Sequence, residues 1–319
     1  TRVRSSAASD VYKRQVVTHL YLGLNAVLRA SGHPKQAMYA TIATVAINTI
    51  LAPIFIFMFD WGIRGAAIAT VSAQVIALLW QLKQFNNANE LLHFRRGIFR
   101  LKRKIVFDSL AIGMSPFLMN LAACLIVILI NQGLKKYGGD LAIGAFGIVN
   151  RLVFIVVMIV MGLNQGMQPI AGYNFGAKLY DRVNKVLKLT IIYATCVTTF
   201  GFLVGMLAPN LVVGIFTSDA ELTELSATGL RITVMFFPII GFQMVTSNFF
   251  QSIGMAGKAI FLSLTRQMLI LLPCLLILPH FFGVAGVWYS MPVSDLLASL
   301  IALVMLVYQF RKFKTAAAH

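Results

Sequence analysis

Asp295 is the acidic residue whose position most strongly predicts a chemical role. It lies in the middle of an apolar run, residues 284–309, and none of the other carboxylates lies well inside such a run. An ionised aspartate at the centre of a membrane is unfavourable by roughly 2.5–3.5 kcal/mol on insertion scales. We therefore expect Asp295 to face the interior of a helix bundle, near a polar residue such as Arg266, Gln267 or Asn120.

Two roles for Asp295 remain open at this stage. Without a contacting arginine, its carboxyl could exchange a proton against a cationic substrate. With Arg266 in contact, the two side chains would form a structural ion pair between helices. Pro292 frees a backbone carbonyl one turn before Asp295, which could help to line a wet cavity.

Other polar side chains inside apolar runs suit a cleft that binds varied ligands. Amide groups donate and accept hydrogen bonds without carrying a charge. Gln165 and Gln168, for example, lie three residues apart on one helical face. The same groups often only join neighbouring helices, so that interpretation stays open for each. The candidates from residue type and position are Asp295, Asn120, Arg151, Gln165, Gln168, Gln243, Arg266 and Gln267.

The sequence carries no enzyme or metal-site signature. It has no P-loop, HExxH, GxSxG or GxGxxG motif. Cys124, Cys196 and Cys274 each lie in an apolar run, without CxxC spacing. We expect no enzyme activity, no cofactor and no bound metal, and any uphill transport would depend on an ion gradient or on another subunit.

Apolar runs of membrane-spanning length position these residues. The chain is 59% hydrophobic and 12% charged, about half the charged fraction of soluble domains. A run of about 20 apolar residues crosses a hydrocarbon layer of ~30 Å as a helix. We expect an all-α polytopic membrane protein with segments at about 16–30, 37–59, 64–84, 110–133, 141–169, 188–209, 229–252, 257–279 and 284–309.

The net charge of +17 follows from basic loops rather than from a nucleic-acid site. Lys and Arg lie in short loops between apolar runs, not on one soluble face. They follow the first, third, fifth and seventh segments and the last one, with Lys135 and Lys136 as exceptions. This pattern predicts a membrane protein with a cytoplasmic C-terminus, and membrane lipids but no nucleic acid as partners. We expect the membrane to be the bacterial inner membrane.

Composition divides the chain further. Residues 1–15 are polar up to an abrupt change at Val16, which predicts a leader foreign to the protein. Residues 85–109 form a basic cytoplasmic linker in which Phe94–Lys104 alternates aromatic and basic residues, typical of a helix on anionic headgroups, although a plain solvated linker is the alternative. Residues 311–319 form a basic cytoplasmic tail.

An internal repeat indicates two related bundles. Arg29–Met38 parallels Gln251–Ile260, and Gly62–Ala66 parallels Gly283–Val287, at offsets of about 222 and 221 residues. Both copies enter the membrane from the same side, which predicts parallel repeats related by an axis along the membrane normal. On this basis 110–310 is a complete six-helix bundle, and 16–84 holds the last three helices of an incomplete first bundle.

An ordered set of motifs resembles the MATE family of multidrug and toxic compound extrusion antiporters, from its fourth to its twelfth helix. The set comprises Ser31–Pro34, Asn48–Phe57, Gly62–Thr70, Gly162–Ala177, Phe250–Gly254 and Ser263–Gln267. The resemblance implies an N-terminally truncated chain of a two-bundle fold around a central cleft. It also implies export of cationic amphiphilic drugs by alternating access, in exchange for H⁺ or Na⁺, by a protein expected to be monomeric when full length.

The resemblance adds two candidate residues, Asn48 and Thr70. They match an asparagine and a threonine of the family's cation site in the first bundle. Ala52 stands where the family has an aspartate, and the helix that carries the remaining aspartate is not in this sequence. Asn48 has the alternative role of bonding neighbouring helices.

Two other functions stay open. A lipid-linked precursor flippase of the same superfamily would line its cleft with several cations, for which Arg151 and Arg266 are the candidates here. A non-transporting membrane scaffold is the third possibility.

Overall fold

The computed structural model describes residues 2–86, 93 and 102–317. These residues are helical, with short connections and no β-strand among them. The chain forms two compact units, Thr1–Lys102 and Arg103–His319.

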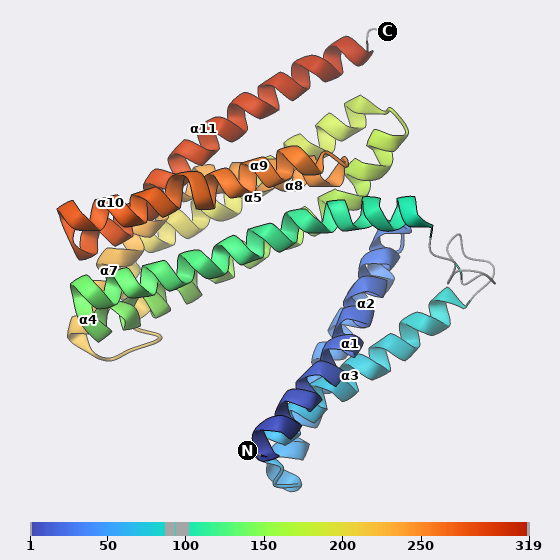
Figure 1. Cartoon of the computed structure of the whole chain (residues 1–319), viewed down its shortest axis with the longest axis horizontal. Coiled ribbons are helices and arrows are strands. Elements are labelled where there is room, and N and C mark those ends of the chain that lie inside the picture. Colours follow the sequence, from blue (N-terminus) through green and yellow to red (C-terminus); the bar gives the residue numbers. More distant parts are fainter. Residues whose placement is uncertain (1, 87–92, 94–101, 318–319) are drawn as a thin grey trace. The chain divides into compact units, whose positions relative to one another are not determined.

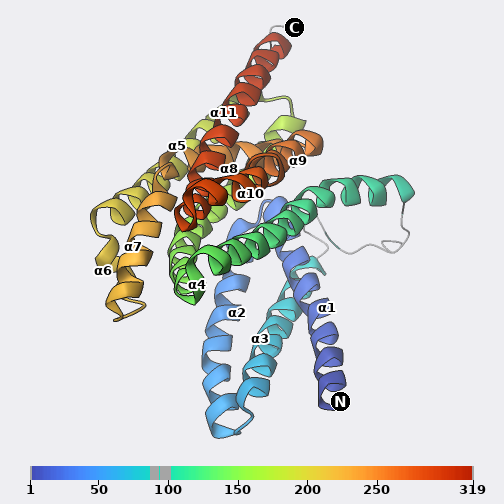
Figure 2. The same ribbon diagram turned by 60° about the vertical axis from the view of Figure 1, so that its left-hand side comes forward.

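The first unit is a three-helix assembly. It contains α1 (Arg2–Ala30), α2 (Pro34–Pro53), the π-helix η1 (Ile54–Met58) and α3 (Gly62–Phe85). The helices α1, α2 and α3 run side by side (Figures 1 and 2). Two small apolar clusters join them, one around Tyr21, Ala40 and Ala77 and one around Leu28, Ala37 and Phe85.

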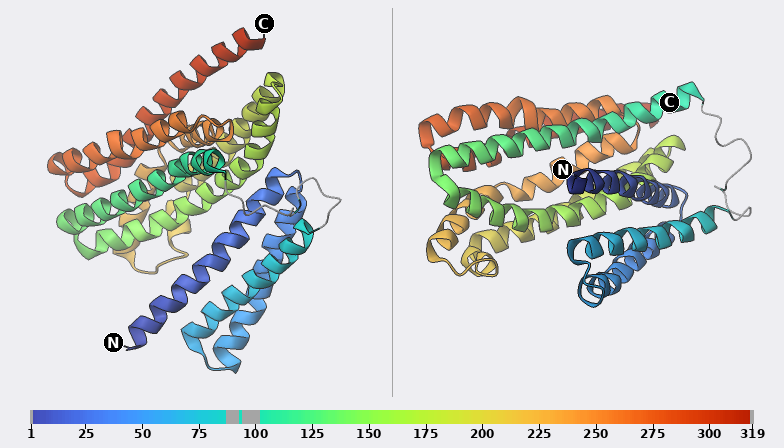
Figure 3. Two further views of the ribbon diagram at one scale, coloured as in Figure 1. Left: turned by 45° about the vertical axis from the view of Figure 1, so that its right-hand side comes forward. Right: turned by 60° about the horizontal axis from the view of Figure 1, so that its bottom comes forward.

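The second unit is a larger helical bundle, shown from further sides in Figure 3. Its helices are α4 (Arg103–Gly176), α5 (Tyr180–Leu207), α6 (Pro209–Val213), α7 (Ala220–Val234), α8 (Phe237–Ser252), α9 (Ala256–Leu264), the π-helix η2 (Thr265–Leu271), α10 (Leu272–Phe282) and α11 (Val284–Ala317).

The element α4 is a hairpin of two helical arms rather than one rod. It has 74 residues, about 110 Å at 1.5 Å per residue, far more than a bilayer needs. Gly139, at φ 67° and ψ −162°, breaks the helical backbone, and the chain then turns back (Figure 3). The connection expected at 134–140 is therefore mostly helical, because one glycine with positive φ makes the turn.

The all-α polytopic fold is confirmed. Among the described residues, six helices are long and apolar enough to cross a membrane, or seven if α7 and α8, bent by 54°, form one span. Each segment expected from the apolar runs lies largely in helical structure, and α4 holds two of them. The expected segments 188–209 and 229–252 each cross a break between two helices.

Several boundaries differ from those expected. α1 begins at Arg2, so its backbone is helical through the segment interpreted as a leader. α11 continues to Ala317, through most of the segment expected as a tail. α3 ends at Phe85 and α4 begins at Arg103, so most of the expected surface helix Phe94–Lys104 lies outside the described residues.

Repeated glycines adopt matching conformations in the two units. Gly32 and Gly254 have φ of 90° and 76°, and Gly62 and Gly283 have φ of 50° and 56°. These left-handed conformations favour glycine because a side chain would strain the backbone. Positive φ thus recurs at the offsets of the sequence repeat, as a parallel repeat predicts. Superposition of 16–84 on 229–309 about the membrane normal stays a prediction.

The core of the second unit holds α11 against the other helices. One apolar cluster includes Leu134, Phe146 and Trp288, and a second includes Phe249 and Phe250. The Trp288 ring lies so close to Gly229 that a Cβ there would stand 2.7 Å from it. Such close packing fixes the rotation of α11, which carries Asp295.

Candidate functional site

An ion pair joins η2 and α11 in the second unit. Arg266 Nε donates a hydrogen bond to Asp295 Oδ1 at 2.7 Å. The Asp295 side chain is 3% exposed and the Arg266 side chain 30% exposed. The expected proximity of Asp295 to Arg266 is confirmed.

The π-helical backbone of η2 brings the Arg266 side chain into contact with Asp295. In this segment the Leu272 N–H bonds to the Gln267 carbonyl, five residues back. Pro273, at the start of α10, has no N–H, and its ring crowds the preceding turn, which favours such a widened turn. The extra residue per turn rotates the side chains of η2 relative to a regular helix.

The contact bears on which role Asp295 plays. Arg266 neutralises the carboxylate, and each charge would be costly without the other in a membrane interior. By the criterion set from the sequence, this arrangement favours the structural role. A coupling role for Asp295 stays a prediction.

A second polar site lies between α4 and α8. Gln168 Nε2 donates to Asn248 Oδ1 at 3.3 Å, and Asn248 Nδ2 donates to the Met244 carbonyl at 2.9 Å. Asn164 lies one turn before Gln168 on the same helical face. Its side-chain amide is buried and has no hydrogen-bond partner in the protein, so it has the capacity to bind a water or a ligand group.

Further polar groups line the interior of α8, α9 and η2. The hydroxyls of Ser247 and Ser263 are 2.9 Å apart. Gln243 is buried, and Gln267 Oε1 is buried without a partner. The structure therefore places Gln168, Gln243, Gln267, Arg266 and Asp295 in the bundle interior or at its edge.

Three other candidates lie on the surface of the second unit. Asn120, Arg151 and Gln165 are exposed. Asn120 Nδ2 bonds to the Pro116 carbonyl of its own helix at 2.8 Å, and no hydrogen bond joins it to Asp295. Their roles depend on what covers these surfaces and stay predictions.

In the first unit the two candidate residues meet. Thr70 Oγ1 donates to Asn48 Oδ1 at 3.3 Å and lies 3.0 Å from the Ala66 carbonyl oxygen. The contact brings together two oxygen atoms that could face a cation, without a carboxylate at Ala52. Among the described residues, no group of three or more acidic, histidine or cysteine side chains could hold a metal ion.

Sequence reasoning missed two buried polar residues, Gln309 and Gln81. Lys258 Nζ donates to Gln309 Oε1 at 2.5 Å and lies 5.3 Å from the centre of the Phe250 ring. Gln81 is fully buried in the first unit, and its amide atoms lack partners. Both glutamines lie inside or at the end of apolar runs, and that position was the available signal.

Comparison with family models gives a match to MatE over residues 112–276, just over half of the chain. The chain belongs to the MATE family. This is a family of membrane transporters rather than enzymes.

Curated relatives agree with the family assignment. Multidrug export protein MepA of Staphylococcus aureus (strain MSSA476) is 29% identical over 296 residues, 92% of this chain and 64% of the relative. MepA of Staphylococcus haemolyticus (strain JCSC1435) is 28% identical with the same coverage. The chain thus spans 64% of the length of these relatives.

Solved structures share the fold. A MATE crystal structure in a bent conformation gives a TM-score of 0.90 at 21% identity, covering 98% of this chain and 70% of its own. The outward-facing conformation of a multidrug resistance MATE transporter gives 0.84 at 22% identity, covering 92% and 66%. At these identities the likeness concerns the fold alone.

Proposed function

We propose that this MATE chain is the larger part of a secondary-active exporter of cationic amphiphilic compounds, driven by inward H⁺ or Na⁺. Family membership carries the proposal, since the relatives that align over 92% of the chain are named multidrug export proteins. Alternating access would move such compounds across a bacterial cytoplasmic membrane.

The polar groups of the second unit are consistent with cationic substrates. Asp295 cancels the charge of Arg266, and the remaining buried polar side chains on α4 and α8 are neutral amides and hydroxyls. Amide oxygens can solvate a cation without binding it too tightly to release, and their amide hydrogens serve varied polar groups.

The flippase alternative receives less support. A pyrophosphate needs several unpaired cations. Of the two arginines assigned to spans from the sequence, Arg266 is paired with Asp295, which leaves Arg151. A scaffold role would leave the buried, unpartnered Asn164 and Gln267 groups without a use.

Ethidium accumulation in an efflux-deficient bacterial host tests the proposal. Cells that express the full-length protein should hold several-fold less dye than cells with an empty vector, and collapse of the ion gradients should abolish the difference. The same dye accumulation is measured in cells that express the 319-residue chain alone. Equal accumulation at verified membrane abundance would contradict the proposal.

The candidate site can be tested in the same assay. Gln168→Leu should weaken efflux because it removes the amide beside Asn248. Gln132→Leu is the matched control, since Gln132 is an exposed glutamine of α4 outside the candidate set. Equal activity of both variants would remove Gln168 from the site.

A further inference from the structure

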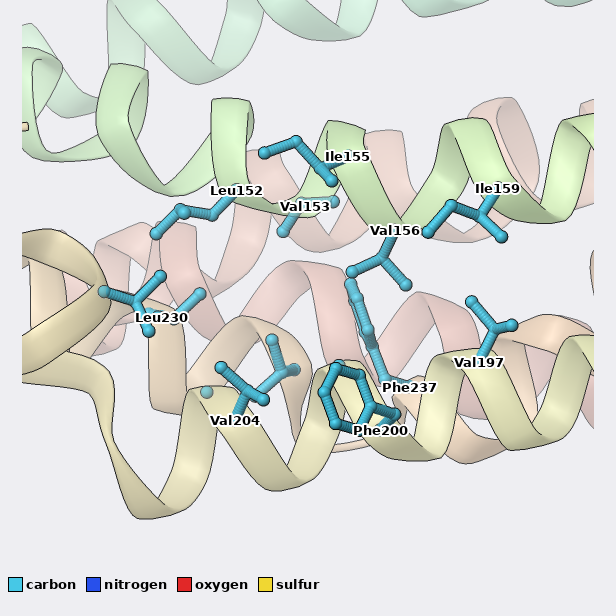
Figure 4. A pocket seen from close by; sticks show the side chains of 14 residues that line it. Leu152, Val153, Ile155, Val156, Ile159, Val197, Phe200, Val204, Leu230 and Phe237 are labelled. Carbon is cyan, nitrogen blue, oxygen red and sulfur yellow. The ribbon is translucent and has the colours of Figure 1, made fainter. Parts of the chain in front are cut away.

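An apolar pocket of about 200 Å³ lies in the second unit, between the second arm of α4 and helices α5 to α8. Figure 4 shows its valine, leucine, isoleucine and phenylalanine side chains converging from these helices. Gly201 and Gly205 complete the lining, so no polar side chain enters it. A ligand inside this pocket can gain only from burial of hydrocarbon.

The mouth of the pocket opens on the outer surface of the unit. Ile155, Ile159 and Phe200, all lining residues, are 56%, 50% and 69% exposed. These residues belong to helices that are long and apolar enough to span a membrane. The lining offers only hydrocarbon contacts, so the ligand chemistry that fits the pocket is an acyl chain.

A polar hollow lies on helices α6 and α7, which also contribute residues to the apolar pocket. Its lining includes Asn210, Thr223, Glu224, Thr228 and Arg231. Leu230, next to Arg231, and Val212, two residues after Asn210, line the apolar pocket. The two cavities therefore draw on the same two helices, and together they suit a molecule with a polar head and an apolar tail.

The hollow carries one charge of each sign in a defined order. Arg231 adjoins the apolar end, and Glu224 lies seven residues nearer the start of α7, about 10 Å along the helix. Both side chains are exposed, and no hydrogen bond or ion pair joins either of them to another described residue. They are available to an external ligand.

We infer that this composite groove binds one phosphatidylethanolamine molecule from the leaflet beside the α6–α7 turn. In that lipid the phosphate lies next to the glycerol and acyl chains, and the ammonium lies outermost. Arg231 would bind the phosphate and Glu224 the ammonium, which matches the order of the charges along α7. Glu224 would favour ethanolamine over choline, because a quaternary ammonium has no N–H to donate.

Native mass spectrometry of the full chain in detergent, titrated separately with phosphatidylethanolamine, phosphatidylcholine and phosphatidylglycerol, tests the inference. The unmodified chain should retain one phosphatidylethanolamine several-fold more tightly than the other two lipids. Arg231→Gln should weaken the binding of all three lipids, by about tenfold or more, since each loses the phosphate contact. Arg182→Gln, an exposed arginine on α5, should change none of the three.

Two further variants distinguish the contribution of the lipid headgroup to binding from that of the acyl chains. Glu224→Gln should lower affinity for phosphatidylethanolamine toward that for phosphatidylcholine and leave phosphatidylglycerol unaffected, with Glu221→Gln on the same helix as control. Val156→Phe should fill the apolar pocket and weaken all three lipids, whereas Val157→Phe, which does not line it, should not.

Three outcomes would overturn the inference. One is equal retention of the three lipids by the unmodified chain. Another is a response of the variants no larger than that of their controls. The third is displacement of the lipid by a stoichiometric cationic dye whose binding depends on Glu224 and Val156, which would assign the groove to a transported compound.

Discussion

Arg266→Gln should destabilise the second unit by about 3–5 kcal/mol, the range measured when one partner of a buried ion pair is removed. Asp295 is 3% exposed, so its carboxylate would be left without either water or a counter-charge. Asp295→Asn should cost less, because Arg266 is 30% exposed and its longer side chain can reach a more polar region. In purified protein the Arg266→Gln change corresponds to a fall in melting midpoint of roughly 6 °C or more.

The double variant Arg266→Gln with Asp295→Asn provides the decisive comparison. It removes both charges and should recover much of the lost stability, since two amides can hydrogen-bond across the same gap. Asp181→Asn and Arg182→Gln, both exposed on α5, serve as controls with little effect. Additive losses in the double variant would show that the two side chains are not energetically coupled.

Transport measured on the same variants distinguishes a structural role of Asp295 from a role in proton coupling. If the pair is structural, the double variant should keep ion-driven efflux when its membrane abundance is restored. If Asp295 couples transport to protons, Asp295→Asn should abolish pH-dependent efflux at normal abundance, and the double variant should not recover it.

Gly286→Ala should destabilise the contact between α10 and α11 by about 1–3 kcal/mol or more, the cost typical of overpacking. A Cβ at Gly286 would lie 2.3 Å from the Leu278 carbonyl oxygen and 2.7 Å from the Pro279 nitrogen. Both atoms belong to the backbone, so relief requires a helix to move. The thermal midpoint of the purified chain measures the effect.

Two other glycines sharpen this prediction. Gly257→Ala, where the added Cβ meets nothing within 4 Å, should be neutral or slightly stabilising, because alanine favours a helix over glycine. Gly65→Ala should reproduce the loss in the first unit, since its Cβ would lie 2.5 Å from the Phe55 carbonyl oxygen. Equal stability of Gly286→Ala and Gly257→Ala would show that the close approach carries no energetic weight.

Helices and turns were predictable because they depend on local pattern. Apolar runs of spanning length can satisfy their backbone groups in lipid only as helices. Positive φ occurs at all four repeated glycines, Gly32, Gly62, Gly254 and Gly283. Glycine adopts this conformation without strain, which explains why the sequence repeat contains glycine at these positions. The contact between Arg266 and Asp295 was also foreseeable, because two opposite charges inside a membrane each need a partner.

Other features depend on packing that no local pattern reveals. The turn at Gly139 replaced an expected seven-residue connection, since Leu134–Gly138 stay helical. The π-helical turn of η2 directs the Arg266 side chain toward Asp295. Pro273 alone did not indicate the length of this π-helical segment. Gln168 bonds to Asn248, 80 residues away, while Gln165 is exposed. Which side chains face inward is decided by the rotation of whole helices.

Dye transport in proteoliposomes tests whether the protein exports cations at the expense of an ion gradient. The full-length protein is reconstituted with a cationic dye on both sides of the membrane, and a H⁺ or a Na⁺ gradient is imposed in separate experiments. At least one gradient should drive the dye against its own concentration gradient, and an ionophore for that ion should stop the movement. A dye distribution identical to that of protein-free liposomes under both gradients, with insertion verified, would contradict this expectation.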